Sequence, residues 1–127
     1  MRPLTGRGVA VLLAAAAAVT LVAVLAAGVM ARTTKPKVVQ VKDDFYSPVK
    51  VKIKKGHKVK WQWGDDFDTH NVTLKTAPTG VKKSKFRSQT TGSPTYHFTR
   101  KFTKPGKYHF YCTIHPFDMT MNVVVRR

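Results

Sequence analysis

Acidic residues and cysteine are both scarce in this chain of 127 residues. It holds only six acidic residues against 23 lysines and arginines, a formal net charge of +17. The single cysteine, Cys112, excludes an intrachain disulfide, so no disulfide framework supports the fold. No cysteine follows the apolar amino-terminal segment, which excludes a lipoprotein signal. Repeats and low-complexity tracts are also missing, apart from the alanine-rich beginning of the chain.

Charge is absent from one long run near the amino terminus. The run from Val9 to Ala31 has 23 uncharged residues and is flanked by arginines, which is typical of a membrane-targeting signal. A cleaved secretory leader and an uncleaved membrane anchor both fit; the length favours the anchor, because leaders usually hold about 7 to 15 apolar residues. We therefore expect a helical signal peptide or anchor at 1–31, a linker at 32–37, and a domain at 38–127 outside the cytoplasm.

The part of the chain after residue 31 is strongly basic. Its 96 residues carry 21 basic and six acidic side chains, a formal charge of +15. Such a field favours an acidic redox partner protein or anionic lipid headgroups. Membrane association through residues 9–31 is expected if they are not removed. Nucleic acid is disfavoured as a partner, because the lysines are spread over many strands and no helix-turn-helix or RNA-recognition motif is present.

Alternation of apolar and polar residues dominates this basic part. Val49, Val51 and Ile53 alternate with lysines, and Val59, Trp61 and Trp63 repeat the pattern. Further short strands are expected around Phe98, at 108–112 and at 122–125, separated by turns rich in glycine and proline. The pattern predicts an all-β sandwich. Its expected core consists of Phe45, Val51, Ile53, Val59, Trp61, Phe98, Phe102, Tyr108 and Phe110.

Four side chains have the types and spacing that a mononuclear copper site needs. Cys112, His115 and Met119 lie in one short segment, and His70 precedes them by more than forty residues. Two imidazoles and one thiolate in a plane, with a distant thioether on the axis, suit one-electron copper chemistry. Each residue alone is common in cores and on surfaces, but together they favour copper ahead of zinc or iron. Met121 is an alternative to Met119 as the axial ligand.

The segments around these side chains resemble those of the cupredoxins, the small blue copper proteins of the plastocyanin, amicyanin and pseudoazurin group. The resemblance covers about residues 38 to 125. It is carried by the stretches 45–48, 56–61, 70–72 and 102–112, together with the segment that follows Cys112. The step from His115 to Phe117 is most similar to the short loop of the amicyanins.

The resemblance implies a Greek-key β-sandwich with one copper ion. His70, Cys112 and His115 would be the equatorial ligands and Met119 the weak axial ligand. Asn71 would link its loop to the cysteine loop and donate a hydrogen bond to the thiolate. The segment departs from the family pattern at Asp118 and Met121, so the axial ligand depends on position relative to the final strand, which favours Met119.

Two functions agree with this chemistry. The first is a one-electron carrier outside the cytoplasm, which transfers electrons through the edge of His115 and makes or breaks no substrate bond. The alternative is an extracytoplasmic copper chaperone or scavenger that delivers copper to an oxidase. An enzyme is disfavoured, because one metal with four protein ligands leaves no open coordination position for a small-molecule substrate.

Overall fold

The computed structural model describes residues 33–64 and 68–127. Residues 32–127 form one compact unit. The helix expected over 1–31 lies outside the described residues. Within the described ranges, no helix has the length and apolar character needed to cross a membrane.

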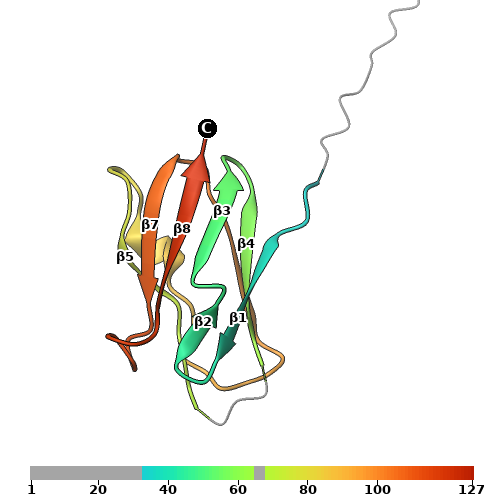
Figure 1. The fold of residues 1–127 in the computed structure, drawn as a ribbon, viewed down its shortest axis with the longest axis vertical. Helices are drawn as coiled ribbons and strands as arrows, with labels where there is room; N and C mark the ends of the chain where they lie inside the picture. Colours follow the sequence, from blue (N-terminus) through green and yellow to red (C-terminus); the bar gives the residue numbers. More distant parts are fainter. Residues whose placement is uncertain (1–32, 65–67) are drawn as a thin grey trace, which may run out of the picture. The chain divides into compact units, whose positions relative to one another are not determined.

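The described residues form two four-stranded sheets (Figure 1). In the first sheet the order is β2 (Phe45–Ser47), β1 (Lys37–Lys42), β4 (Lys58–Trp63) and β6 (His97–Lys101). In the second it is β3 (Lys50–Lys54), β8 (Thr120–Arg126), β7 (Gly106–Tyr111) and β5 (Thr73–Thr76). Strands β1 and β4 run parallel, as do β3 and β8, and the other neighbouring pairs are antiparallel. The predicted all-β, two-sheet architecture is confirmed, with one short 3-10 helix, η1 (Lys83–Phe86), added to it.

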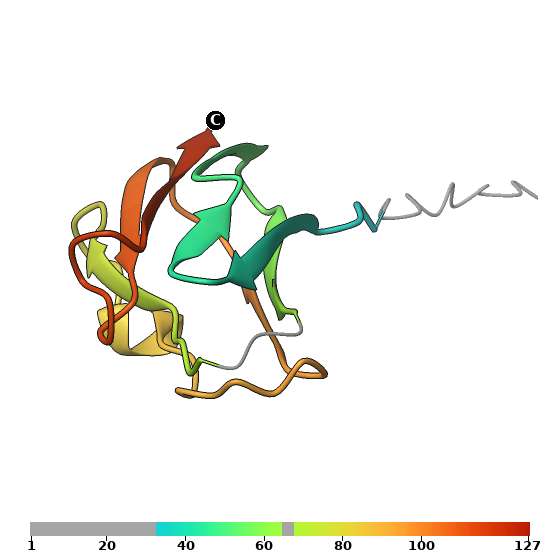
Figure 2. The same cartoon turned by 60° about the horizontal axis from the view of Figure 1, so that its bottom comes forward.

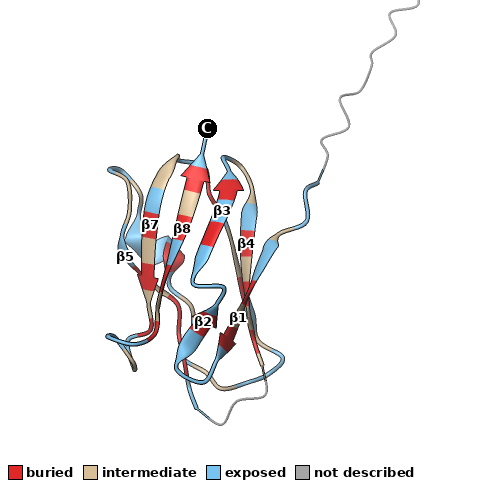
Figure 3. Ribbon diagram, in the orientation of Figure 1, coloured by how far each residue is buried: buried red, intermediate tan, exposed pale blue. Residues whose placement is uncertain are grey.

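Buried and exposed positions alternate along the strands of both sheets (Figure 3), and the buried positions are mostly apolar. On β3, Val51 and Ile53 are buried while the three lysines are exposed, as the alternation predicts. Trp61 lies at the centre of the core, with its ring centroid 5.0 Å from that of Phe110 and 5.7 Å from that of Phe98. Full burial of one such large apolar side chain stabilises the folded state by about 1.5–3 kcal/mol. The described core extends from Val39 to Val125, so this unit encloses its own core and is expected to fold without the preceding residues.

One expected core residue, Phe45, is largely exposed instead, and so is Val49, which shares the alternation of Val51 and Ile53. Phe45 is 45% exposed, and its neighbour Tyr46 is fully buried in its place. Because successive side chains of a strand face opposite ways, burial of Tyr46 on β2 turns Phe45 outward. Val49 is 60% exposed because it precedes the first paired residue of β3 and lies outside the enclosed space. The other expected core residues are buried.

One end of the unit gathers the segments on which the predicted ligands lie. Strands β1 and β7 both run toward the lower end of Figure 1, and Figure 2 brings that end forward. The β1–β2 turn at 43–44 and the loop after Cys112 lie there. Strand β7 starts at its opposite end, directly after Lys104 and Pro105. Because a six-residue strand spans about 20 Å, the segment 104–105 and the loop after Cys112 lie about that far apart.

Candidate metal centre

Three of the four predicted ligands converge at this end of the unit. A nitrogen of His70, the sulfur of Cys112 and a nitrogen of His115 lie within 4.8 Å of one another. His70 and Cys112 are fully buried, and the side chain of His115 is 26% exposed. The fold thus brings His70 to the loop that carries the other two, as the sequence requires. Only one edge of one imidazole reaches solvent from this cluster.

Backbone hydrogen bonds fix the two segments that present these side chains. His70 forms an isolated β-bridge with Thr91, with N···O distances of 3.1 and 3.0 Å. Cys112 directly follows β7, so the end of that strand sets its position. The N–H of Cys112 donates to the carbonyl of Met119, and the N–H of Met119 donates to the carbonyl of His115, both at 3.0 Å. These bonds close the segment 112–119 into a compact loop.

Asn71 connects the two ligand-bearing segments. Its backbone N–H donates to the sulfur of Cys112 at 3.4 Å. Its side-chain oxygen accepts from the backbone N–H of Thr113 at 3.1 Å, and its Nδ2 donates to the hydroxyl of the same threonine at 2.6 Å. The hydroxyl of Tyr46 donates to the carbonyl of Asn71 at 2.6 Å. Asn71 therefore links the two ligand-bearing segments through hydrogen bonds to Cys112 and Thr113.

Tyr46 stays a neutral hydrogen-bond donor beside the cluster. Burial raises the pKa of its hydroxyl, and the electrostatic effect of the nearby Cys112 raises this pKa further. The proton of Tyr46 therefore remains available to the Asn71 carbonyl across the physiological pH range. The role of Tyr46 was not predicted from the sequence, because Phe45 was expected at the buried position of β2.

The two candidate axial methionines differ in what their surroundings offer. Both are buried. The sulfur of Met121 accepts a hydrogen bond from Nε1–H of Trp61 at 3.1 Å. Met121 is on β8, opposite Phe110 of β7. Met119 ends the ligand loop through the backbone bonds described above. The Met121 sulfur is therefore engaged in the core between the sheets, which leaves Met119 as the methionine that belongs to the loop.

The two ring nitrogens of His115 lie in different surroundings. Nδ1 is buried, and no described residue hydrogen bonds to it. Nε2 lies 3.1 Å from Oδ1 of Asp44, on the β1–β2 turn. Asp44 was not predicted as a site residue, because no local spacing in the sequence relates it to His115. A histidine binds a metal through the nitrogen lone pair of its neutral imidazole. In His115 the nitrogen available for this is the buried Nδ1.

The donor set fits copper. Two imidazole nitrogens and one buried thiol, within a few ångströms of one another, match the trigonal His and Cys set of blue copper sites. A thiolate is a soft ligand that suits Cu(I), and imidazole suits Cu(II) as well, so the set serves both oxidation states.

Comparison with known proteins places the chain in a family. Residues 35–126 match the model for copper binding proteins of the plastocyanin/azurin family. Amicyanin-alpha from Methylorubrum extorquens is 38% identical over 119 residues, which cover 88% of this chain and 93% of that protein. The chain therefore belongs to the plastocyanin/azurin family, which is to say that it is a cupredoxin and a copper protein.

Solved structures of related proteins agree with this assignment. Amicyanin from Paracoccus versutus is 30% identical, with a TM-score of 0.61, and the match covers 73% of this chain and 83% of that one. A copper-containing nitrite reductase from Thermus scotoductus is 26% identical, with a TM-score of 0.63 over 73% of this chain. This chain spans only 23% of the length of the reductase, so the likeness to it concerns one domain.

Proposed function

We propose that this chain is a one-electron carrier with a mononuclear type 1 copper site, and that it works outside the cytoplasm. The observation that carries this proposal is the cluster of His70, Cys112 and His115, which is enclosed except at one imidazole edge. Enclosure favours electron transfer over bond-making chemistry, because the described residues bury His70 and Cys112 fully and leave His115 only partly exposed. Bound copper would supply a Cu(II)/Cu(I) couple.

Copper would be held by the sulfur of Cys112, by His70 and Nδ1 of His115, and more weakly by the sulfur of Met119. Engagement of the Met121 sulfur by Trp61 supports the choice of Met119. Asn71 holds the two ligand-bearing segments together and donates to the thiolate, a contact that tunes the affinity and potential of a metal site. A ligand cage held by protein hydrogen bonds keeps one geometry in both oxidation states, so little rearrangement accompanies electron transfer.

The edge of His115 is the proposed exit for the electron. Exposed apolar side chains lie beside it in the ligand loop, where Ile114 is 50% exposed and Phe117 is 92% exposed. Such side chains allow a partner protein to exclude water and approach the imidazole closely. The partner itself is proposed to be acidic, because the domain carries a formal charge of +15.

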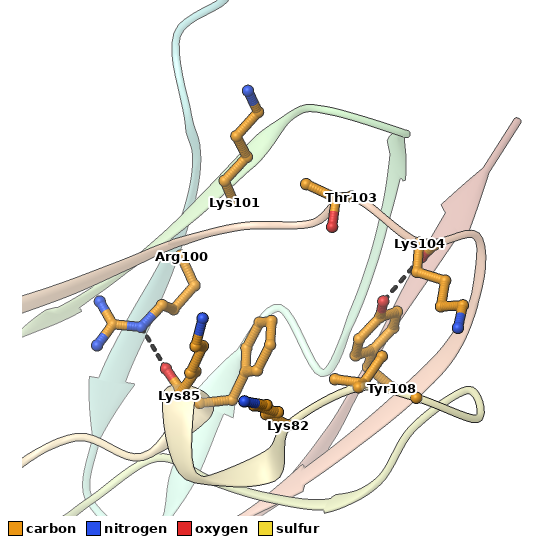
Figure 4. Close-up of a pocket in the computed structure, with 10 residues that line it drawn as sticks. Lys82, Lys85, Arg100, Lys101, Thr103, Lys104 and Tyr108 are labelled. Atoms are coloured by element: carbon orange, nitrogen blue, oxygen red, sulfur yellow. Dashed lines mark hydrogen bonds between the residues drawn. The ribbon is translucent and has the colours of Figure 1, made fainter.

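A basic hollow near the beginning of β7 supports an acidic partner (Figure 4). It has a volume of about 600 Å³, and the residues that line it include five cations and no acid: Lys82, Lys85, Arg100, Lys101 and Lys104. The guanidinium of Arg100 is fixed by a hydrogen bond of 2.5 Å from its Nε to the carbonyl of Lys85. Phe86 and Tyr108 contribute aromatic surface. This basic hollow shares no lining residue with the metal centre, so we assign it to electrostatic recruitment.

The cell location is proposed from the sequence. The apolar run at 9–31 directs the domain across a membrane and holds it there if the run is not removed. Copper delivery to an oxidase is the competing function. A buried, preformed ligand set favours retention of the metal over ready release, which favours the electron carrier.

The visible absorption spectrum of residues 32–127 with Cu(II) tests the copper site. We expect an intense thiolate-to-copper band in the red, bleached by ascorbate and restored by a mild oxidant. The matched control is Cys112→Ser, which keeps the size of the side chain and removes the thiolate. Copper binding without the band in the unsubstituted protein, or the same band in the Cys112→Ser protein, would exclude the proposed site.

A further inference from the structure

Asp44 lies in a turn whose backbone favours a small polar residue. It follows Asp43 between β1 and β2 and has a φ of +58°, in the left-handed region. Apart from glycine, Asp and Asn are the residues that adopt this conformation most readily. The turn places the Asp44 carboxylate at the end of the unit that carries the ligand loop. From there Oδ1 reaches Nε2 of His115 at 3.1 Å.

The contact determines which nitrogen of His115 carries the proton. A carboxylate can only accept hydrogen bonds, so the 3.1 Å contact requires a proton on Nε2. In the neutral imidazole, Nδ1 then holds a lone pair, and Nδ1 is the buried nitrogen that no described residue hydrogen bonds. A metal-binding histidine whose second nitrogen donates to a carboxylate is a recurrent arrangement, which fixes the ring and makes the ligand more basic.

Exposure limits the strength of the effect. The Asp44 side chain is 55% exposed and that of His115 is 26% exposed, so water screens part of the attraction. The contact is therefore too weak to hold the site together, which the backbone bonds of the ligand loop already do.

We propose that Asp44 is a positioning residue for the copper site. Its carboxylate holds His115 in the tautomer that presents Nδ1 to the metal, and it favours Cu(II) over Cu(I) by placing negative charge against the outer edge of a ligand. This proposal rests on the proposed function, because it takes His115 as a copper ligand. In this proposal, the edge of His115 through which electrons leave is hydrogen bonded to Asp44.

Two substitutions of Asp44 separate charge from hydrogen bonding. Asp44→Asn removes the charge and keeps both a side-chain oxygen and the preference for the left-handed turn. Asp44→Gly removes the acceptor without straining a backbone at φ +58°. The matched control is Asp43→Asn, which removes the same charge from the adjacent position of the same turn. A second carboxylate, that of Asp68, belongs to the same 4.8 Å group as Asp44 and His115. The control therefore has to separate the loss of negative charge near the ring from the loss of the Asp44 contact itself.

The first readout is the ratio of the dissociation constants for Cu(II) and Cu(I) in residues 32–127, obtained from the reduction potential. We expect Asp44→Gly to raise this ratio by about tenfold, the lower end of the effect of losing an outer partner of a ligand. For a one-electron couple this is a rise of about 59 mV in the potential. Asp44→Asn should produce part of this rise, and Asp43→Asn less than about a third of it. Equal shifts in Asp44→Gly and Asp43→Asn, or no shift, would overturn the proposal.

The second readout needs no metal. Nitrogen-15 NMR of the copper-free protein near neutral pH reports the tautomer of His115. We expect one tautomer, protonated at Nε2, in the unsubstituted protein, and a mixture in Asp44→Gly. A mixture already present in the unsubstituted protein would contradict the Asp44 contact while leaving the copper proposal intact. Conversely, a single Nε2–H tautomer in a protein that shows no thiolate-to-copper band would overturn the proposed function, and the redox role of Asp44 with it.

Discussion

Strand β7 joins two regions of this protein that differ in how their side chains are used. Cys112 follows its last residue, and there polar groups meet in short, directed contacts: Asn71 to the thiol, Asn71 to Thr113, and Asp44 to His115. The basic hollow lies near its first residue, and five cations gather there with no acid among the lining residues. The first region depends on geometry and the second on net charge. A substitution should therefore affect metal chemistry in one region and encounters with a partner in the other.

The largest expected effect comes from the core beneath the basic hollow. Phe102 is fully buried, with ring centroids 4.9 Å from Tyr108 and 5.2 Å from Phe86. Phe102→Ala should lower the free energy of unfolding of residues 32–127 by about 3–5 kcal/mol, through lost burial and the cavity that remains. Chemical denaturation measures it. The copper band of the protein that stays folded should keep its position, and a shifted band would show that the two regions are coupled.

The next largest effect is expected at the metal centre. Asn71→Ala removes the side-chain bonds to Thr113 and Thr90 and loosens the link between the two ligand-bearing segments. We expect copper affinity to fall by about 10- to 100-fold, as when outer partners of metal ligands are lost. Competition with a chelator measures this. Salt dependence of partner association should be unchanged, which distinguishes loss of geometry from loss of charge.

The methionines sharpen the comparison within the metal end itself. Met119→Leu should shift the copper band and raise the reduction potential, because a weak sulfur ligand is lost. Met121→Leu keeps the volume but removes the acceptor of the Trp61 Nε1–H, so it should cost about 1–3 kcal/mol of stability while the band stays in place. Absorption spectra of the two variants decide between them. If Met121→Leu moves the band and Met119→Leu does not, the axial assignment is reversed.

The smallest effect is expected from the basic hollow. We expect a triple variant to associate with an acidic redox protein a few-fold more slowly at low salt, and with a smaller loss at high salt: Lys82→Gln, Lys85→Gln and Lys101→Gln. The reason is that charged groups steer encounters, and salt screens them beyond a Debye length of about 10 Å at 0.1 M. The matched control is the triple variant Lys50→Gln, Lys52→Gln and Lys54→Gln on β3, with the same change in charge. Stopped-flow mixing measures the rates. Equal slowing in both would assign recruitment to net charge and not to the hollow.

The parts of this account that could be read from the sequence are those encoded by local spacing. Alternation on β3 and β4 predicts the sandwich, and the interval from Cys112 to His115 predicts that one loop presents both ligands. Phe45 was wrongly placed in the core, because alternation on a strand of three residues does not say which of its faces is buried. Strand β5 gave little signal, since only Leu74 is buried there.

The contacts that tune the site escaped the sequence for a different reason. Asp44 reaches His115, and Tyr46 reaches Asn71, across long stretches of chain that only the folded sheets bring together. A pair of aspartates in a turn is ordinary, and nothing in its spacing points to a histidine far along the chain. Only the folded positions of the β1–β2 turn and the ligand loop make this pairing visible.

Retention of copper through a redox cycle tests the central claim most directly. Residues 32–127 loaded with Cu(II) are reduced with ascorbate, exposed to a Cu(I) chelator, separated from it and reoxidised. The account predicts that the thiolate-to-copper band returns to nearly its starting intensity over repeated cycles, because one preformed ligand set holds both oxidation states. Transfer of the copper to the chelator in the first cycle would contradict an electron carrier and favour copper delivery.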